Sequence, residues 1–158
     1  MPVVCQYNPS TGASIYTAHG QGTNAFSGGV LVQNGRVVMV PYDSSTVAVY
    51  NPENGGSVAT TTPTGAPAAA FSGGFLTPSG NVIFVPYSSS SFGVYDPSRS
   101  TYSTGGFIGS GTSKFIGGSL MLDGRGIFAP YSYANVVVLN TIGSVPPELC
   151  LSPYLNKF

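Results

Sequence analysis

One stretch of 27 residues returns three times along this 158-residue chain, and it constrains the fold more than any other feature. It reads FSGGVLVQNGRVVMVPYDSSTVAVYNP from Phe26, FSGGFLTPSGNVIFVPYSSSSFGVYDP from Phe71 and FIGGSLMLDGRGIFAPYSYANVVVLNT from Phe115. The first two copies agree at 15 of 27 positions without a gap, and the copies begin 45 and 44 residues apart. A period of this length indicates a repeat architecture in which every unit has the same local structure.

Each complete unit predicts four short β-strands. Asn34-Gly35, Ser79-Gly80 and Asp123-Gly124 separate the first two apolar runs. Asn-Gly and Asp-Gly favour a two-residue hairpin turn with positive φ. A Pro-Tyr pair ends the second run, because proline cannot donate to a strand ladder. We expect the first strand at residues 29–33 and 74–77, and the second at 36–40, 81–85 and 125–129. We expect the third strand at 47–50, 92–95 and 136–139, and the fourth at 57–61 and 101–104.

The second strands show how the units pack. Their residues, such as Val37-Val38-Met39-Val40, form continuous apolar runs rather than an alternation of apolar and polar residues. Such a run, bounded by turns, is typical of a strand that is buried on both faces. We therefore expect nearly complete burial of Val38, Val40, Ile83, Phe84, Val85 and Phe128. Blades stacked face to face produce this pattern, whereas a single two-layer sandwich gives cleaner alternation.

The sequence thus predicts one all-β domain over residues 1–141, followed by an irregular tail over residues 142–158. We expect three four-stranded repeats of 44–45 residues arranged as propeller-like blades, with a β-trefoil or β-prism of pseudo-threefold symmetry as the alternative. The units lie near residues 26–70, 71–114 and 115–141, and residues 3–18 complete a unit. Three units fall short of the four to eight blades of typical propellers. Either the chain closes a compact three-bladed ring, or several copies share one ring.

The two ends of the domain match the same part of the repeat. Val3–Tyr7 aligns with the third strand of a unit, and so does the last recognisable strand, Val136–Leu139. In a closed ring the N-terminal segment must complete a sheet whose other strands come from the C-terminal unit or from another copy, since a free apolar edge invites aggregation. We expect the segment to pair with a strand, and the tail to cover an edge or to dock on a neighbouring subunit.

Charge is scarce and balanced, which limits the classes of partner. Five Lys and Arg residues face five Asp and Glu residues, and only 6% of the chain is charged, against about 25% in an ordinary soluble domain. Without a basic field we expect neither a nucleic-acid nor a membrane partner. A neutral surface of this kind suits a protein that is largely covered in an assembly. The N-terminus predicts no signal peptide, and no apolar run is long enough to span a membrane.

Three tyrosines, Tyr42, Tyr87 and Tyr131, hold the same place in the three units. They form a candidate interaction surface, because aromatic rings on one face can stack on sugars or on a protein partner. The structural interpretation, which we favour, is that each ring caps a blade with its body buried and its hydroxyl in water. Asn8, Asn51, Asp96 and Asn140 also recur, in a position typical of turns rather than of a metal site.

The sequence offers no catalytic residues, no metal site and no cofactor site. His19 is the one histidine and lacks a Cys or Ser at a recognisable spacing, so we expect a loop residue. The carboxylates fall at different places in the units and give no facing pair. The Gly-Gly pairs precede no helix, so they are not phosphate loops; we expect them to let backbones approach closely. Cys5 and Cys150 either form a bridge or, as we favour, remain buried free thiols.

The repeat resembles the kelch-like blades of β-propellers. The Gly-Gly pair, the Tyr95-Asp96-Pro97 ending of the third strand, the later Tyr102 and the period carry the resemblance. The chain departs from that pattern because it has no tryptophan and because the spacing after Gly-Gly differs. The longer string F-S-G-G-x-L-x-x-x-G-x-V-x-x-V-P-Y is similar to repeats of bacterial and bacteriophage surface and virion proteins, and this likeness covers most of the chain.

Three functions follow from these features. The first is a non-catalytic structural or interaction protein of a larger assembly, namely a decoration, cement or fibre component of a phage-like virion. Its partners would be capsid or tail subunits or copies of itself, and its location the virion, with the cytoplasm or the cell surface as alternatives. The second is a carbohydrate-binding module with a glycan partner. The third, which we favour least, is a hydrolase or lyase on a propeller.

Overall fold

The computed structural model describes residues 2–53 and 56–141, and these residues form strands and loops without an α-helix. The strands assemble into four antiparallel sheets that follow one another along the chain. Sheet 1 contains β1 (Val3–Asn8) and β2 (Ala13–Ala18). Sheet 2 contains β3 (Phe26–Leu31), β4 (Val37–Pro41), β5 (Thr46–Asn51) and β6 (Ser57–Pro63). Sheet 3 contains β7 (Phe71–Leu76), β8 (Val82–Pro86), β9 (Ser91–Asp96) and β10 (Thr101–Phe107). Sheet 4 contains β11 (Phe115–Leu120), β12 (Arg125–Pro130) and β13 (Val137–Asn140).

Each sheet is a propeller-like blade, because its strands pair in chain order and only within their own sheet among the described residues. The repeats over 26–70 and 71–114 each form the expected four strands. The third unit contributes three strands, and the place for its fourth lies beyond Thr141, outside the described residues, as does the predicted tail. The β-trefoil and β-prism alternatives are not adopted.

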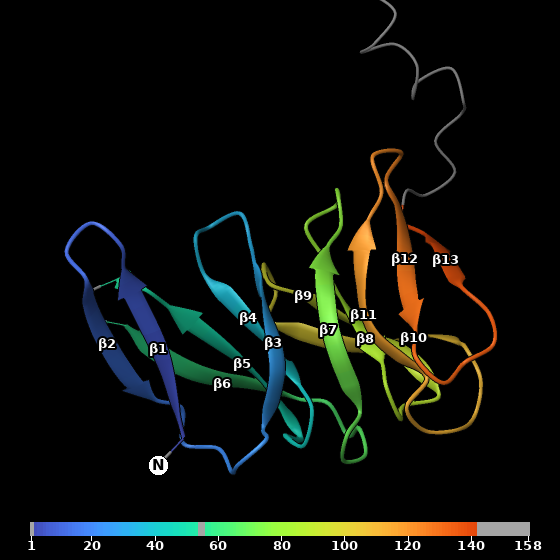
Figure 1. Ribbon diagram of the computed structural model, residues 1–158, viewed down its shortest axis with the longest axis horizontal. Helices are drawn as coiled ribbons and strands as arrows, with labels where there is room; N and C mark the ends of the chain where they lie inside the picture. The colour runs from blue at the N-terminus through green and yellow to red at the C-terminus, as the bar shows by residue number, and fades with distance from the viewer. Residues whose placement is uncertain (1, 54–55, 142–158) are drawn as a thin grey trace, which may run out of the picture.

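The four sheets stand in an open row. Figure 1 shows sheet 1 at one end and sheet 4 at the other, and the first strands of sheets 2, 3 and 4, namely β3, β7 and β11, lie side by side along the row. The described part of the chain therefore does not close a three-bladed ring on itself, which was one of the two arrangements left open by the sequence. The other arrangement, in which several copies share one ring, stays a prediction.

Apolar junctions hold the row together. We define the forward face of a sheet as the face toward the next sheet along the chain, and the backward face as the opposite one. At the first full junction, forward-face Val30, Val38 and Val40 of sheet 2 join a buried cluster with Phe71 and Phe84 of sheet 3. At the second, Phe75, Ile83 and Val85 of sheet 3 join Phe115 and Phe128 of sheet 4. Of the three second strands, β8 is thus sandwiched between sheets on both sides, as its apolar run predicts, whereas β4 and β12 are each buried mainly on one face.

Burial confirms this part of the prediction. The side chains of Val38, Val40, Phe84, Val85 and Phe128 are 0% exposed, and that of Ile83 is 4% exposed. Strand β8 is buried along its whole length because it has a sheet on either side. Strand β12 is more exposed than β8, because no described residue covers the forward face of sheet 4.

The glycines of the hairpins have the expected positive φ, but they belong to a three-residue loop rather than to a two-residue turn. Gly35, Gly80 and Gly124 have φ of 78°, 88° and 81°. The Gly35 N–H donates to the Val32 carbonyl (3.0 Å), and the equivalent bonds recur in the other two units. The loop therefore has three residues, a type I turn followed by a left-handed glycine. The predicted two-residue turn is wrong because the residue before each glycine keeps negative φ.

The Gly-Gly pairs allow the backbones of neighbouring sheets to approach, as expected. A Cβ added to Gly73 would lie 3.1 Å from the Gly117 Cα, and one added to Gly28 would lie 3.9 Å from the Gly73 Cα. A register shift separates the first residue of β3, β7 and β11 from the second glycine of each pair. The Ser27 hydroxyl adds a hydrogen bond across this contact, donating to the Phe71 carbonyl (2.9 Å).

Sheet 1 occupies only the outer half of a blade. Strand β1 pairs in full with β2, from Val3 opposite Ala18 to Asn8 opposite Ala13, and the described residues give it no other strand partner. The expectation that β1 pairs with a strand is confirmed, and that strand is β2. The structure also corrects the favoured state of Cys5, whose side chain is exposed rather than buried. Cys150 lies outside the described residues.

Replacing Phe84 by alanine should lower the free energy of unfolding by about 3–5 kcal/mol, because the variant leaves a cavity in the first full junction. The Phe84 ring lies against those of Phe71, Tyr95 and Tyr102, with centroids 5.6, 6.4 and 6.4 Å away. Urea denaturation measures the loss. Phe107→Ala is the control, since that side chain is 74% exposed and should cost less than about 0.5 kcal/mol. Equal losses in the two variants would contradict the sandwiched core.

Two glycine substitutions should separate backbone strain from crowding. Gly35→Ala adds a Cβ at φ 78° with nothing within 4 Å, so only the left-handed backbone should cost stability, about 1 kcal/mol. Gly73→Ala adds the same strain at φ 77° and also presses on the Gly117 backbone. Denaturation midpoints should therefore fall further for Gly73→Ala. A loss no larger than that of Gly35→Ala would show that the sheets are not in close contact there.

Candidate functional site

The three tyrosines predicted as a surface lie at the junctions between units and link them through their backbones. The N–H groups of Tyr42, Tyr87 and Tyr131 each donate a 2.8 Å hydrogen bond to a backbone carbonyl. The acceptor is the residue just before the first strand of the same unit, namely Ala25, Ala70 and Lys114. The carbonyl of Tyr42 accepts from Ala70 N–H (3.0 Å), and that of Tyr87 accepts from Lys114 N–H (2.9 Å) of the following unit. This ladder fixes each Pro-Tyr segment where one sheet meets the next.

The structure brings two of the three rings together. The Tyr42 and Tyr87 rings are half-buried, with centroids 5.7 Å apart and planes inclined at 51°. Ser113 Oγ donates to the Tyr87 hydroxyl oxygen (2.9 Å). The Tyr131 side chain is 63% exposed and stands apart from this ring pair. The site is therefore a pair of tyrosines with a third at a distance, and its binding role stays a prediction.

Lys114 sits at the same junction, and sequence reasoning missed it. The equivalent residues of the other units are Ala25 and Ala70, which are 4% and 0% exposed. Lys114 is 2% exposed, and its Nζ donates to the Gly111 carbonyl (2.6 Å). Burial lowers the pKa of the Lys114 ammonium. The signal was present in the repeat alignment, where a lysine replaces two alanines.

A groove of mixed character lies between sheets 2 and 3, at the end where the hairpin of sheet 2 meets the turn after β9. Polar Asn34, Arg36 and Ser100 line it together with apolar Val49 and Pro97. Sequence reasoning missed it because the two turns come from different units. Apolar walls with a few hydrogen-bonding groups are typical of small-molecule sites.

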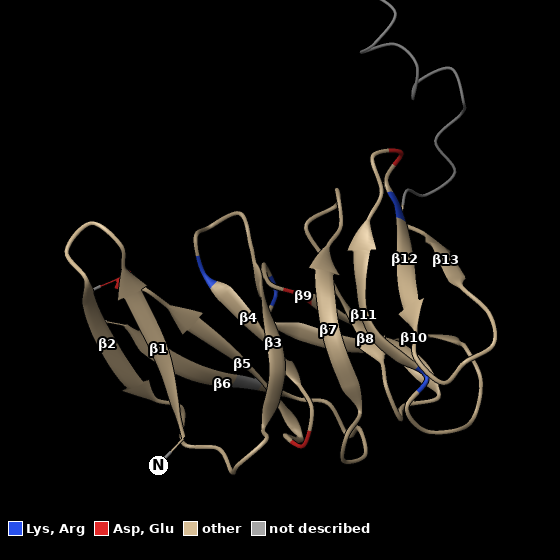
Figure 2. Ribbon diagram, in the orientation of Figure 1, with Lys and Arg blue, Asp and Glu red and all other residues tan. Residues whose placement is uncertain are grey.

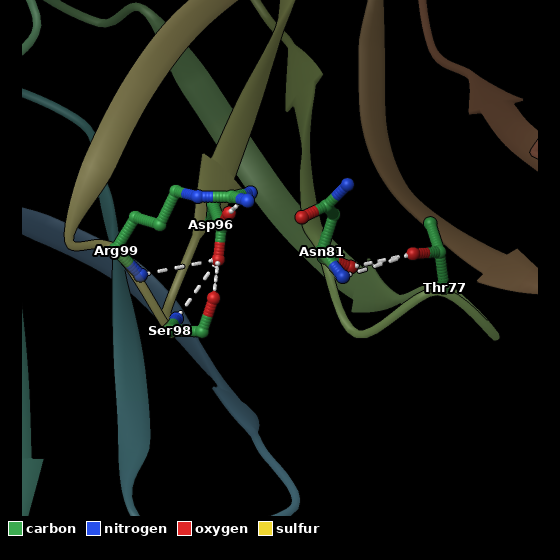
Figure 3. Close-up of polar contacts among 5 residues, drawn as sticks. All are labelled: Thr77, Asn81, Asp96, Ser98 and Arg99. Carbon is green, nitrogen blue, oxygen red and sulfur yellow. Dashed lines mark hydrogen bonds and ion pairs between the residues drawn. The ribbon is translucent and has the colours of Figure 1, made fainter.

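Asp96 holds the turn beside this groove (Figure 3). Its Oδ1 accepts from Ser98 Oγ (2.6 Å), Ser98 N (2.9 Å) and Arg99 N (3.3 Å), and its Oδ2 pairs with Arg99 Nη1 (3.0 Å). The Ser98 hydroxyl bond, more than any other contact, lowers the pKa of the Asp96 carboxyl. Asn8 and Asn51 make equivalent bonds to the N–H two residues on, so the turn interpretation of these Asx residues is confirmed there. Thr77 and Asn81 fix the adjacent hairpin in the same figure.

The ionisable side chains of the described residues are dispersed rather than clustered. Figure 2 shows the charged residues scattered over turns and strand ends, and no group of three potential metal ligands occurs in the described ranges. His19 lies in a loop, where its Nδ1 accepts from Gln21 N (3.3 Å) and its ring meets Phe26 edge-on at 5.3 Å. Within the part of the chain that the structure describes, there is no helix of the length and hydropathy that a membrane span requires.

The forward face of sheet 4 is the largest departure from the pattern of the inner sheets. Five residues, which we call the terminal face, line an open depression there: Ile116, Ser119, Ile127, Ala129 and Val136. Ile116 and Val136 are 52% and 54% exposed. The residues equivalent to Ser119, Ile127 and Ala129 in sheet 3 are Phe75, Ile83 and Val85, which are at most 6% exposed. The terminal face thus occupies the positions that form a junction in sheet 3, and within the described part of the chain it is exposed.

The buried Lys114 ammonium should make stability depend on pH. With a folded pKa below the usual 10.5, the unfolded chain holds this proton over a range where the folded chain has lost it, so stability rises with pH just below 10.5. We expect wild type to gain stability relative to Lys114→Ala as the pH is raised from neutrality toward 10.5. Urea denaturation at several pH values measures this difference. Arg36→Ala, which removes an exposed cation, controls for net charge, and an equal pH trend in both variants would contradict the assignment.

Comparison with solved structures shows a likeness in fold. A catalytically inactive virginiamycin B lyase from Staphylococcus aureus, solved with quinupristin, superposes with a TM-score of 0.65 and 12% identity. The extracellular domain of a putative one-component system of B. thetaiotaomicron gives a TM-score of 0.58 and 12% identity. The match covers 92% of this chain and 49% of the lyase, and 81% of this chain and 19% of the second protein, so the chain spans about half the length of the lyase. No family model and no curated protein matches the sequence. The chain is thus similar in fold to β-propeller proteins.

Proposed function

We propose that this chain is a non-catalytic structural or interaction protein of a larger assembly. The observation that carries the proposal is the terminal face, an apolar junction surface that no described residue covers. Contiguous apolar surface of this kind marks a site of protein–protein contact in soluble proteins. The same positions in sheets 2 and 3 are buried by the next sheet, which supports a partner that packs on this face in the same way.

The chemistry of the terminal face favours a protein partner. None of its five residues is charged, and Gly117 and Gly118 border it. Within the chain, the surface that covers these positions is an apolar β-sheet with glycines at the point of closest approach. A partner that presents such a sheet would bury the face in the same way. The low charge of the whole chain fits a surface that is occupied by neighbours.

The finer assignment extends this proposal to a decoration, cement or fibre component of a phage-like virion. It rests on the resemblance of the F-S-G-G repeat string to repeats of bacteriophage and bacterial surface proteins, together with the kelch-like period. The partners would then be capsid or tail subunits or further copies of the chain. The lyase activity named for the Staphylococcus aureus neighbour would need a reaction centre. The one histidine of this chain, His19, makes its contacts with Gln21 and Phe26 instead.

Carbohydrate binding is the second candidate function, and the Tyr42–Tyr87 pair favours it. Two half-buried rings 5.7 Å apart present an amphipathic surface on which a sugar ring can stack. Beside these rings, the Tyr87 hydroxyl and Ser113 Oγ, which are 2.9 Å apart, are polar groups that could bond to sugar hydroxyls. A glycan array probed with wild type and with Tyr42→Ala separates the two functions, because a structural protein shows no signal that depends on Tyr42.

The assembly function is tested on particles from a source that produces the chain. Density-gradient fractions analysed by quantitative mass spectrometry should contain the chain at a fixed ratio to the main shell or tail protein. Ala129→Arg, which places a charge on the terminal face, should lower that ratio at least about tenfold, since an unpaired charge is costly to bury. Leu122→Arg is the matched control, because Leu122 lies fully exposed in a turn off the face. A chain that stays in the particle-free fraction would refute the proposal.

A further inference from the structure

Sheet 1 fills the outer positions of a blade and leaves the inner ones open. The alignment makes Gln6 the equivalent of Val49 and Tyr7 the equivalent of Tyr50. The contacts agree, since the Tyr50 hydroxyl donates to Gln6 Oε1 (2.7 Å), while the equivalent Tyr95 lies beside Val49 at the next junction. Strands β1 and β2 therefore stand where a third and a fourth strand belong.

The inner half of this position borders an apolar surface. The backward face of sheet 2 carries Phe26, Val37 and Met39, which are half-buried, and Leu31, which is 64% exposed. In sheet 3 the equivalents are Phe71, Val82 and Phe84, which are 0% exposed, and Leu76, which packs against their cluster. The difference arises because first and second strands of a preceding blade cover sheet 3 but not sheet 2.

Sheet 4 has the inner strands that sheet 1 lacks, but its outer half is incomplete among the described residues. It holds a first, a second and a third strand, but its third strand β13 is the shortest of the described strands, at four residues. The units end their third strand in Tyr50-Asn51-Pro52 and Tyr95-Asp96-Pro97, whereas β13 runs into Leu139-Asn140-Thr141. That signature reappears as Tyr7-Asn8-Pro9 in β1, at the opposite end of the row.

Burial shows that the tyrosine of this signature belongs in a junction. Tyr50 and Tyr95 are 5% and 0% exposed, whereas Tyr7 is 60% exposed. Strand β13 is exposed on one side, with Val138 at 49%, while Val137 and Leu139 pack against the cluster of the second junction and four residue pairs join the strand to β12. Strand β1, which carries this signature, therefore matches the third position of a blade but leaves its tyrosine exposed. Strand β13, which occupies the third position of sheet 4, is short and has Leu139 in place of the tyrosine.

We propose that two copies of the chain close one ring by exchanging strands. Strands β11 and β12 of one copy enter the open inner half of sheet 1 of the other copy, and β1 of that copy replaces β13 beside β12. Strand β2 then supplies the fourth strand that the described part of sheet 4 lacks. This inference rests on the proposed interaction function, and it names a second copy as the partner of the terminal face.

The exchange repeats contacts that the chain already makes. The terminal face, with Ile127 and Ala129, meets Gly29 and Met39 of the second copy as Val40 meets Gly74 and Val85 meets Gly118 within the chain. The receiving copy needs no rearrangement, since β1 and β2 already stand in the outer positions. The donating copy releases only β13, whose ladder to β12 is replaced by that of β1.

The number of strands is consistent with a closed ring. Each copy then owns sheets 2 and 3 and shares two composite sheets, so two copies form six four-stranded blades. Six lies within the range of four to eight that closed propellers use. A closed two-fold pair leaves no open end, and one chain spans about half of the lyase with which it shares its fold.

The register of the exchanged strand gives a direct test. Ile83 lies opposite Val94 in sheet 3, so Ile127 of one copy should lie opposite Gln6 of the other. In a background with both native cysteines replaced by serine, the pair Gln6→Cys and Ile127→Cys should oxidise to a covalent dimer on a non-reducing gel. Gln6→Cys with Leu122→Cys is the control, and it should stay monomeric because Leu122 lies in an exposed turn.

Mass in solution completes the test on the full chain. Sedimentation analysis should give the mass of two chains, and Tyr7→Asp should weaken the association at least tenfold, whereas Phe107→Asp on an exposed strand end should leave it unchanged. A monomer at every concentration, or a dimer without the 6–127 bond, would overturn the exchange. Since this test uses the purified chain alone, its failure with continued incorporation into particles would leave the proposed function standing.

Discussion

The structure depends on one constraint: a blade with apolar residues on both faces is stable only between two neighbours. Strand β8 shows the constraint in full, because all of its side chains are buried by sheets on either side. Two other features of the repeat support this contact between sheets. The glycines of β3, β7 and β11 let the sheets approach, and the Pro-Tyr segments connect one unit to the next through backbone hydrogen bonds.

The same constraint explains why the exposed junction residues lie at the two ends of the row. An internal junction is satisfied within the chain, whereas the terminal face and the backward face of sheet 2 keep junction residues in contact with solvent. Burial of apolar surface contributes about 25 cal/mol per Å², so covering either face with a matching sheet would stabilise the molecule. This is the physical basis of the association that we propose.

Much of the fold follows from local patterns. The predicted strands of the first two units agree with β3–β10 to within a few residues, because each is bounded by a glycine turn or a proline. Positive φ at Gly35 is similarly local, since few other residues adopt that conformation at low cost. The candidate site was predicted only in part. The shared position of Tyr42 and Tyr87 is visible in the repeat, but the contact of their rings and the burial of Lys114 depend on how two sheets meet.

The sequence alone determined the strands and the burial of the core residues of the second strands, because those properties depend on residues within one unit. Tertiary structure decided the rest. The three-residue hairpin loop depends on the register between β3 and β4, which a Gly position does not specify. The open row, the groove between Asn34 and Ser100 and the exposure of Tyr7 depend on the number and stacking of sheets. A repeat encodes the contact between neighbours, but the number of neighbours is a property of the whole assembly.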